Sequence, residues 1–174
     1  MKRTIYLYLI LLFIFFNLTA QQQKSIDHTL QLLNNNSVPY ISVQKLNEEL
    51  LKGEVLIFDT RKKEEYQVSR IKNAKFIGEQ LNTDSLSLDV LDKDQPIVVY
   101  CSIGVRSEDL GEVLLKKGFT NVKNLYGGIF LWKNKGFEVF DQLDRPTENI
   151  HAYNRFWGRL LKSGNKIYWW KAYS

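Results

Sequence analysis

The chain has few of the residues from which disulfides, metal sites and histidine-dependent catalysis are built. Its 174 residues include one cysteine, two histidines and three prolines. A single cysteine excludes an intramolecular disulfide, so the fold must be stable through its hydrophobic core alone. The two histidines, His28 and His151, are far in sequence from the cysteine, which gives little support to a Cys–His protease site. No cluster of ligand types indicates a metal site.

The chain also has little excess charge of one sign. Its formal net charge is +5, and without Lys2 and Arg3 there are 22 basic residues against 19 acidic ones. A surplus of this size does not indicate nucleic acid binding. The hydrophobic share of 44% and the length predict one globular domain with a core of its own.

The longest apolar run lies near the N-terminus, where twelve apolar residues, 5–16, follow two basic ones. Twelve residues are few for crossing a bilayer core of about 30 Å, and the pattern is typical of a secretory signal peptide. We therefore expect residues 1–20 to be a signal peptide that is cleaved after Ala20, and the protein to be exported, either periplasmic or secreted. The alternative is an uncleaved leader that anchors the chain in a membrane.

Two segments flank the expected domain. Residues 21–38 contain glutamine and asparagine runs and are predicted to form a polar linker or a loose N-terminal arm, in which His28 is a solvated surface residue. Residues 141–174 form an aromatic C-terminal extension, with four apolar residues between 156 and 161 that share a helical face. We expect this extension to pack back on the domain. A membrane surface or a partner groove is the alternative use of its tryptophans and lysines.

Between residues 39 and 140, short apolar runs alternate with amphipathic stretches. The runs at 40–41, 55–59, 75–77, 96–100 and 122–126 are predicted strands. Four helices are expected: one from residue 43 to its end at Gly53, one within 60–68, one from after the cysteine to Gly118, and one at 129–135. A short helix with a variable loop is expected within 78–94. This alternation predicts an α/β fold with helices on both faces of its sheet.

The single cysteine, Cys101, directly follows the strand at 96–100 and begins a short loop that leads into a helix. The backbone N–H groups of such a loop and of a helix N-terminus form an anion site. Together with Arg106 they would stabilise Cys101 as a thiolate. Asp59 also ends a strand, so we expect Asp59 and Cys101 at the same edge of the sheet. A buried structural cysteine is the alternative interpretation.

The loop sequence from Cys101 to Ser107, CSIGVRS, resembles the active-site loop of the rhodanese family. Three further segments fit that family in the same order: 58–61 with Glu65 and Tyr66 after it, 71–74, and 127–129 with Trp132. The resemblance covers residues 39–140. It implies a rhodanese-like domain with a five-stranded parallel sheet flanked by helices on both faces.

The resemblance also implies a sulfurtransferase. Cys101 would take a sulfane sulfur from thiosulfate or a similar donor and pass it, as a persulfide, to a thiophilic acceptor. Four residues separate Cys101 from Arg106, whereas the phosphatases and arsenate reductases that share the fold use five, so the spacing favours sulfur. The substrate-binding loop would comprise Ser102, Ile103, Gly104, Val105, Arg106 and Ser107.

Individual roles within this site stay open. Gly104 gives the loop the freedom to aim its N–H groups inward, and Ser107 is expected to bond a free N–H at the helix start. Asp59 and Arg61 are expected to support the site, either as an ion pair at the rim or by touching substrate. Arg106 either binds an anion or braces the loop against Asp59 or Glu65, with bracing favoured.

Two departures from the family pattern concern the donor. Ser102 occupies a position that often holds Arg or Lys in enzymes that use thiosulfate, and Ser69-Arg70-Ile71 replaces the family's Gly-His-Ile. A polythionate, a persulfide or a protein thiol is therefore an alternative donor. We expect no cofactor, no metal and no nucleic acid partner, only a small sulfur-containing anion or thiol, or a protein thiol. The alternative function is a catalytically silent binding or thiol-redox module, and a phosphatase ranks third.

Overall fold

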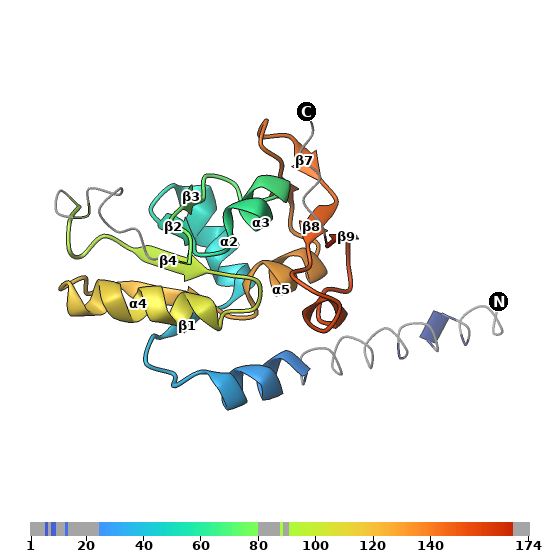
Figure 1. The fold of residues 1–174 in the computed structure, drawn as a ribbon, viewed down its shortest axis with the longest axis horizontal. Helices are drawn as coiled ribbons and strands as arrows, with labels where there is room; N and C mark the ends of the chain where they lie inside the picture. Colours follow the sequence, from blue (N-terminus) through green and yellow to red (C-terminus); the bar gives the residue numbers. More distant parts are fainter. Residues whose placement is uncertain are drawn as a thin grey trace.

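The computed structural model describes residues 6, 8, 9, 13, 25–79, 88 and 91–168. Its centre is a five-stranded, wholly parallel sheet with the strand order β1-β5-β4-β2-β3 (Figure 1). The strands are β1 (Tyr40–Ile41), β2 (Leu56–Asp59), β3 (Lys75–Phe76), β4 (Ile97–Tyr100) and β5 (Val122–Leu125). The expected five-stranded parallel sheet is confirmed.

Three helices lie between these strands in the described chain, namely α2 (Val43–Lys52), α3 (Lys63–Val68) and α4 (Arg106–Lys116), and α5 (Gly128–Asn134) follows β5. The signals that bound α2 act as predicted. The Ser42 hydroxyl oxygen accepts a hydrogen bond from the Lys45 N–H at 3.1 Å, which satisfies a free donor of the first turn. At the other end, Gly53 adopts a left-handed conformation with φ 73° and stops the helix.

Helices cover both faces of the sheet, as expected, because neighbouring strand residues point to opposite sides. On one face, Phe58 and Val99 pack with Leu110 and Leu114 of α4. The opposite face carries Ile57, Val98, Tyr100 and Leu125, which pack with apolar residues of α2 and α5. The sheet is therefore buried on two sides, and its reactive groups can be presented only at an edge or at a strand end.

Strand register brings the two predicted site segments together. Asp59, the last residue of β2, is paired with Tyr100, the last residue of β4. The Thr60 N–H continues this pairing by donating to the Tyr100 carbonyl oxygen at 3.0 Å. Cys101 therefore leaves the sheet at the same edge as Asp59, as the sequence predicted.

The N-terminal segment differs from expectation. Residues 25–33 are helical, and Ile26 and Leu30 are buried in the core beside α5. The turn that follows is held by Glu108 of α4, whose carboxylate oxygens accept hydrogen bonds from the N–H groups of Asn35 and Ser37, both at 3.0 Å. Residues 25–38 thus pack on the domain instead of forming a polar linker or loose arm, because two apolar side chains one turn apart suffice to dock the helix. His28 is exposed, as expected.

The C-terminal segment adds structure beyond β5. Strands β6 (Val139–Phe140) and β7 (Pro146–Thr147) pair antiparallel, and β8 (Asn149–His151) and β9 (Asn165–Ile167) pair parallel, beside α3 and α5 in Figure 1. The helical face expected at 156–161 is reduced to a single 3-10 turn, η3 (Trp157–Arg159). Leu160 and Leu161 are buried in the core while Phe156 is 61% exposed, so the four apolar residues do not share one face.

Two expectations concern residues that lie mostly outside the described ranges. The leader, 1–20, is described only at positions 6, 8, 9 and 13, and the short helix expected within 78–94 falls largely on 80–87 and 89–90. Among the described residues, no helix is both long and apolar enough to span a membrane. The signal peptide and the export that it implies stay predictions.

If the N-terminal helix docks on the domain, substitutions at its buried and exposed leucines should affect stability differently. Leu30 is 2% exposed and Leu32 is 68% exposed on the same helix. We expect Leu30→Ala to lower the free energy of unfolding by about 2–4 kcal/mol, because it opens a cavity in the core. Leu32→Ala, measured by the same urea titration of the full chain, should stay within about 0.5 kcal/mol of wild type. Equal effects of the two substitutions would show that the helix does not dock.

Candidate active site

The loop 101–105 connects β4 to α4 and carries the only cysteine. Cys101 is 1% exposed, and its Sγ accepts a hydrogen bond from the Gly104 N–H at 3.1 Å. The side chain also lines a cavity of about 220 Å³, so the sulfur is enclosed but lies at a cavity wall and not in the centre of the core. A backbone N–H directed at sulfur stabilises a thiolate more than a thiol.

The carbonyl groups of the loop are bound from outside it. The N–H groups of Ile129 and Phe130, in the first turn of α5, donate to the carbonyl oxygens of Cys101 and Ser102, both at 3.0 Å. The Gly104 carbonyl oxygen accepts from the side-chain amides of Asn34 and Asn124, both at 2.8 Å. In a trans peptide the N–H points opposite to the carbonyl. Binding these carbonyls therefore directs the following N–H groups away from α5 and from the two asparagines.

Two glycines are required for this loop geometry. Gly104 has φ 101°, a conformation that side chains rarely allow, and a Cβ there would lie 3.0 Å from the Leu125 carbonyl oxygen. Gly128 has φ 54°, and a Cβ there would lie 2.4 Å from the Cys101 carbonyl oxygen. The second glycine lets the N-terminus of α5 approach the loop closely. The freedom expected of Gly104 is confirmed, and the contact of Gly128 with the loop was not predicted.

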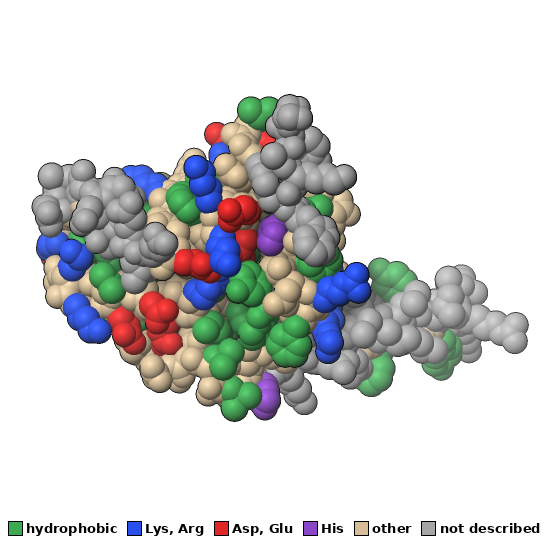
Figure 2. Space-filling view, in the orientation of Figure 1, with side chains coloured by type: hydrophobic (Ala, Val, Ile, Leu, Met, Phe, Trp, Pro, Cys, Tyr) green, Lys and Arg blue, Asp and Glu red, His purple; other side chains and the backbone are tan. Residues whose placement is uncertain are grey.

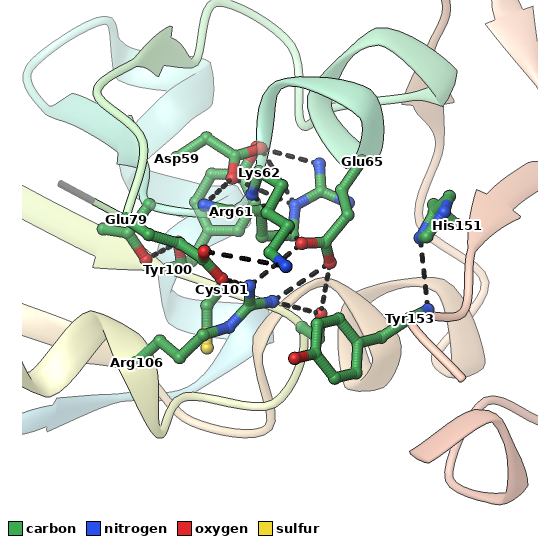
Figure 3. Close-up of polar contacts among 12 residues, drawn as sticks. Asp59, Arg61, Lys62, Glu65, Glu79, Tyr100, Cys101, Arg106, His151 and Tyr153 are labelled. Carbon is green, nitrogen blue, oxygen red and sulfur yellow. Dashed lines mark hydrogen bonds and ion pairs between the residues drawn. The ribbon is translucent and has the colours of Figure 1, made fainter. Parts of the chain in front are cut away.

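Arg106, the first residue of α4, braces the loop as favoured by the sequence. Its Nη1 and Nη2 contact the two carboxylate oxygens of Glu65 at 2.9 and 3.0 Å, and Nη1 also pairs with Glu79 (Figure 3). The Ser102 hydroxyl lies between them, donating to Glu65 Oε1 and accepting from Arg106 Nη2, each at 3.0 Å. Ser102 is thus fixed by the ion pair and does not supply a charge of its own.

The charges of this cluster influence one another. Burial alone would raise the pKa of Glu65, but the hydrogen bonds and charge of Arg106 outweigh it and hold the pKa below its ordinary value. Burial alone would lower the pKa of Arg106, but hydrogen bonds to Glu65 and the negative charges of Cys101 and Glu65 raise it. Both groups are therefore ionised at neutral pH.

Asp59 and Arg61 form a buried ion pair behind the loop. Both side chains are fully buried, and Arg61 Nη2 lies 2.6 Å from Asp59 Oδ2 and 2.6 Å from the Ser69 carbonyl oxygen. Burial, and then the charge of Asp59, raise the pKa of the neighbouring Tyr100 hydroxyl well above its ordinary value. Of the two roles that the sequence left open, the structure supports the ion pair, because neither side chain lines the cavity.

Ser107 does not act as expected. Its hydroxyl is buried and donates to the Asn124 side-chain oxygen at 2.7 Å, so it does not bond a free N–H at the start of α4. Because Asn124 in turn donates to the Gly104 carbonyl oxygen, Ser107 orients the asparagine that holds the loop. The remaining loop residues, Ile103 and Val105, line the cavity beside Cys101.

The cavity has a second wall that the sequence analysis did not assign to the site. Tyr153 and Trp157, from the C-terminal extension, face the loop. The described residues that line the cavity are Cys101, Ser102, Ile103, Val105, Arg106, Tyr153 and Trp157. Arg106 Cζ lies 5.0 Å from the centre of the Tyr153 ring (Figure 3). The surface in Figure 2 shows the same combination, with hydrophobic side chains gathered beside interleaved basic and acidic ones.

The other residues missed by the sequence analysis are Asn34, Asn124 and Glu79. Asn34 lies in a run of three asparagines that reads as a polar linker, and Asn124 lies within a strand, so neither carries a local signal of loop contact. Among the described residues, no group of three or more His, Cys, Asp or Glu side chains is placed to hold a metal ion.

Comparison with known proteins agrees with the resemblance seen in the sequence. Residues 42–135 match the family model for the rhodanese-like domain. A "tRNA uridine(34) hydroxylase" from Yersinia enterocolitica is 31% identical in an alignment of 132 residues that covers 66% of this chain and 38% of that protein. A second protein of that name, from Hamiltonella defensa, is 34% identical over 52% of this chain and 26% of its own length. The chain thus spans well under half of these relatives.

Solved structures show the same domain. A rhodanese-related protein from Thermoplasma volcanium superposes with a TM-score of 0.51 and 26% identity, covering 58% of this chain and 96% of that one. A rhodanese-like domain protein from Staphylococcus aureus gives a TM-score of 0.50 and 32% identity, covering 57% and 96%. The segments flanking 42–135, which include Tyr153 and Trp157, lie outside the family model.

The buried Glu65 predicts a pH-dependent loss of stability. Glu65→Gln keeps the shape but removes the charge opposite Arg106, and we expect it to lower the free energy of unfolding by about 2 kcal/mol at pH 7. This is less than a fully buried pair would lose, because Arg106 is 25% exposed. Folding lowers the pKa of Glu65 from its ordinary value of 4.5. The stability that the Glu65 carboxylate contributes is therefore fully present above pH 4.5 and is lost as the pH falls through the pKa of the folded protein.

Urea unfolding of wild type and Glu65→Gln at several pH values between 7 and 3 checks this. The gap between the two proteins should narrow as the pH falls below 4.5. The neighbouring Glu64 is exposed, and Glu64→Gln serves as the control, with a change within about 0.5 kcal/mol. A gap that is constant over this pH range would show that the Glu65 charge does not stabilise the fold.

Proposed function

Because this chain belongs to the rhodanese-like domain family, we propose that it is a sulfurtransferase that moves a sulfane sulfur from a donor to a thiophilic acceptor through a persulfide on Cys101. One observation carries the proposal: Cys101 Sγ accepts the Gly104 N–H at 3.1 Å and lines a cavity large enough for a small donor. A sulfur buried in the core, with the loop amides turned from it, would have no access to a substrate.

The proposed reaction has two displacement steps. The Cys101 thiolate attacks the outer sulfur of the donor, a new S–S bond forms, and the donor's own S–S bond breaks as its leaving group departs with the electron pair. With thiosulfate the leaving group is sulfite. A thiophile then attacks the outer sulfur of the persulfide, which restores the Cys101 thiolate. No external oxidant or reductant is consumed in either step.

The chain's residues support the charged sulfur in both steps. The Gly104 N–H donates to Sγ, and the loop carbonyls that are bound by α5, Asn34 and Asn124 keep the loop in this shape before substrate arrives. Arg106 supplies a nearby positive charge but is held by Glu65, so it acts by position and field more than by direct capture of an anion. Neither step needs a histidine as base, since the nucleophile is the thiolate itself.

We do not extend the activity named for the curated relatives to this chain. Their names describe hydroxylases of tRNA, of which this chain spans 26–38%. Residues 42–135 of this chain match the rhodanese-like domain. We therefore propose the chemistry of that domain, with a small sulfur compound or a thiol as partner, and not the activity of the larger proteins.

Intact-mass spectrometry of the full chain after exposure to a sulfane donor tests the proposal. We expect wild type to gain the mass of one sulfur atom and to lose it on addition of cyanide, which accepts sulfane sulfur. Cys101→Ser should gain none, because no other thiol is present in the chain. Ser163→Cys in the Cys101→Ser background places a thiol outside the loop and controls for the reactivity of any thiol.

Failure of the folded wild type to gain sulfur from thiosulfate, a polythionate or an organic persulfide would contradict the proposal. It would favour the alternative, a binding or thiol-redox module in which Cys101 forms mixed disulfides. Equal loading of the Ser163→Cys control would show that the loop confers no special reactivity.

A further inference from the structure

The cavity wall opposite Cys101 is a built part of the fold. Tyr153 has φ 62°, an unusual conformation for an aromatic residue, and its N–H donates to His151 Nδ1 at 3.2 Å. On its far side, the Asn154 side-chain oxygen accepts the N–H groups of Phe156 and Trp157 at 2.9 and 3.0 Å. These bonds fix the turn that carries Tyr153 and Trp157, so the two rings are held in place over the loop.

His151 suits this role as an acceptor. It is 9% exposed, and burial, opposed mainly by the charge of Glu65, lowers its pKa. The neutral imidazole offers Nδ1 as an acceptor for the Tyr153 N–H. The Ala152 N–H donates to the Ile167 carbonyl oxygen at 2.8 Å, which continues the pairing of β8 with β9 within the extension.

The charge beside this wall is balanced. Among the described residues that line the cavity, Arg106 is the one basic residue, and it is already paired with Glu65 and Glu79. Lys62 adds a second positive charge nearby, 4.0 Å from Glu79 and 5.6 Å from the centre of the Tyr153 ring. Within the part of the chain that the structure describes, the basic groups of Arg106 and Lys62 are thus matched by the acidic groups of Glu65 and Glu79.

A doubly charged donor is poorly matched to such a cavity. Thiosulfate would have to lose water on entering a space walled by Ile103, Val105, Tyr153 and Trp157, where Arg106, the one basic residue of the described lining, is already paired. An uncharged apolar group loses little on the same transfer and gains contact with the rings. The volume of about 220 Å³ lies below the range of about 300–1,000 Å³ for pockets that hold drug-sized ligands, so the group must be small.

From these observations we infer that the sulfur donor is a small organic persulfide with an uncharged, apolar substituent, which Tyr153 and Trp157 select. The inference rests on the sulfur transfer proposed above. In the reaction the Cys101 thiolate attacks the outer sulfur of R–S–SH and forms the new S–S bond. The bond between the two donor sulfurs breaks, R–S⁻ leaves with the electron pair, and the proton stays on the transferred sulfur.

A pair of donors with the same reactive group separates substituent recognition from intrinsic reactivity. The full chain is treated with benzyl hydropersulfide or with the hydropersulfide of mercaptoacetate, which carries a carboxylate. The rate of sulfur gain at Cys101 is measured by intact mass and divided by the rate of the same donor with free cysteine. We expect the normalised rate to favour the benzyl donor by at least about tenfold, the discrimination that a hydrophobic pocket typically provides.

Substitutions in the wall formed by Tyr153 and Trp157 test how much it contributes to the donor preference. Trp157→Ala should reduce the preference to within about threefold by slowing the benzyl donor, while Trp157→Phe, which keeps an aromatic ring, should retain most of it. Leu51→Ala removes an apolar side chain that is 81% exposed on α2 and serves as the matched control. Glu79→Gln frees Arg106 from one carboxylate, so it should speed loading by the carboxylate donor and by thiosulfate.

The outcomes separate the two proposals. Equal normalised rates for the two persulfides, or a preference unchanged in Trp157→Ala, would overturn the substrate assignment while leaving sulfur transfer intact. Absence of sulfur gain from every donor, with wild type folded by circular dichroism, would overturn both.

Discussion

The pairing of Glu65 with Arg106 determines how this site is assembled. Glu65 lies on α3 and is almost fully buried, whereas Arg106 is the first residue of α4. Their two parallel contacts close the loop 101–105 from one side, and Ser102 is bonded to both partners. A buried carboxylate without its arginine would be costly, so the pair makes the loop position a condition of folding.

The opposite side of the loop depends on backbone bonds and close packing. The first N–H groups of α5 need acceptors, because a helix leaves them unpaired, and the loop carbonyls provide them. Asn34 and Asn124 bind the Gly104 carbonyl from two different segments. Loop shape, the N-terminal helix and α5 therefore stabilise one another. A change in any of them would be transmitted to the sulfur through the Gly104 N–H.

The same ion pair that shapes the loop also limits what it can bind. An arginine held by two carboxylates contributes structure and a local field but little free charge for an anionic substrate. The apolar character of the cavity then comes from Ile103, Val105 and the two rings of the extension. In the proposed reaction, donor specificity would thus depend on residues 149–168, which lie beyond the part that matches the family model.

Local patterns predicted the sheet, because strand runs, helix caps and glycine stops are encoded by neighbouring residues such as Ser42 and Gly53. The place of Cys101 at a strand end and the bracing role of Arg106 followed from the loop sequence. The contacts that Asn34 and Asn124 make with the loop were not predictable. Asn34 reaches Gly104 across 70 positions, and nothing in a run of asparagines indicates that.

Two further differences from expectation, in the N-terminal segment and at Ser107, also arise from contacts with residues distant in the sequence. The helix at 25–33 is polar enough to read as a linker, yet Ile26 and Leu30 dock it. The Ser107 hydroxyl donates a hydrogen bond to the Asn124 side-chain oxygen and does not accept one from a helix N–H, because it points into the domain and not along the helix.

The most direct test of the central claim is a crystal structure of the full chain after treatment with a sulfane donor. Electron density for one additional sulfur atom on Cys101 Sγ, inside the cavity between the loop and the rings of Tyr153 and Trp157, is the expected result. An unmodified Sγ that points into the core, with the Gly104 N–H turned away from it, would contradict the claim.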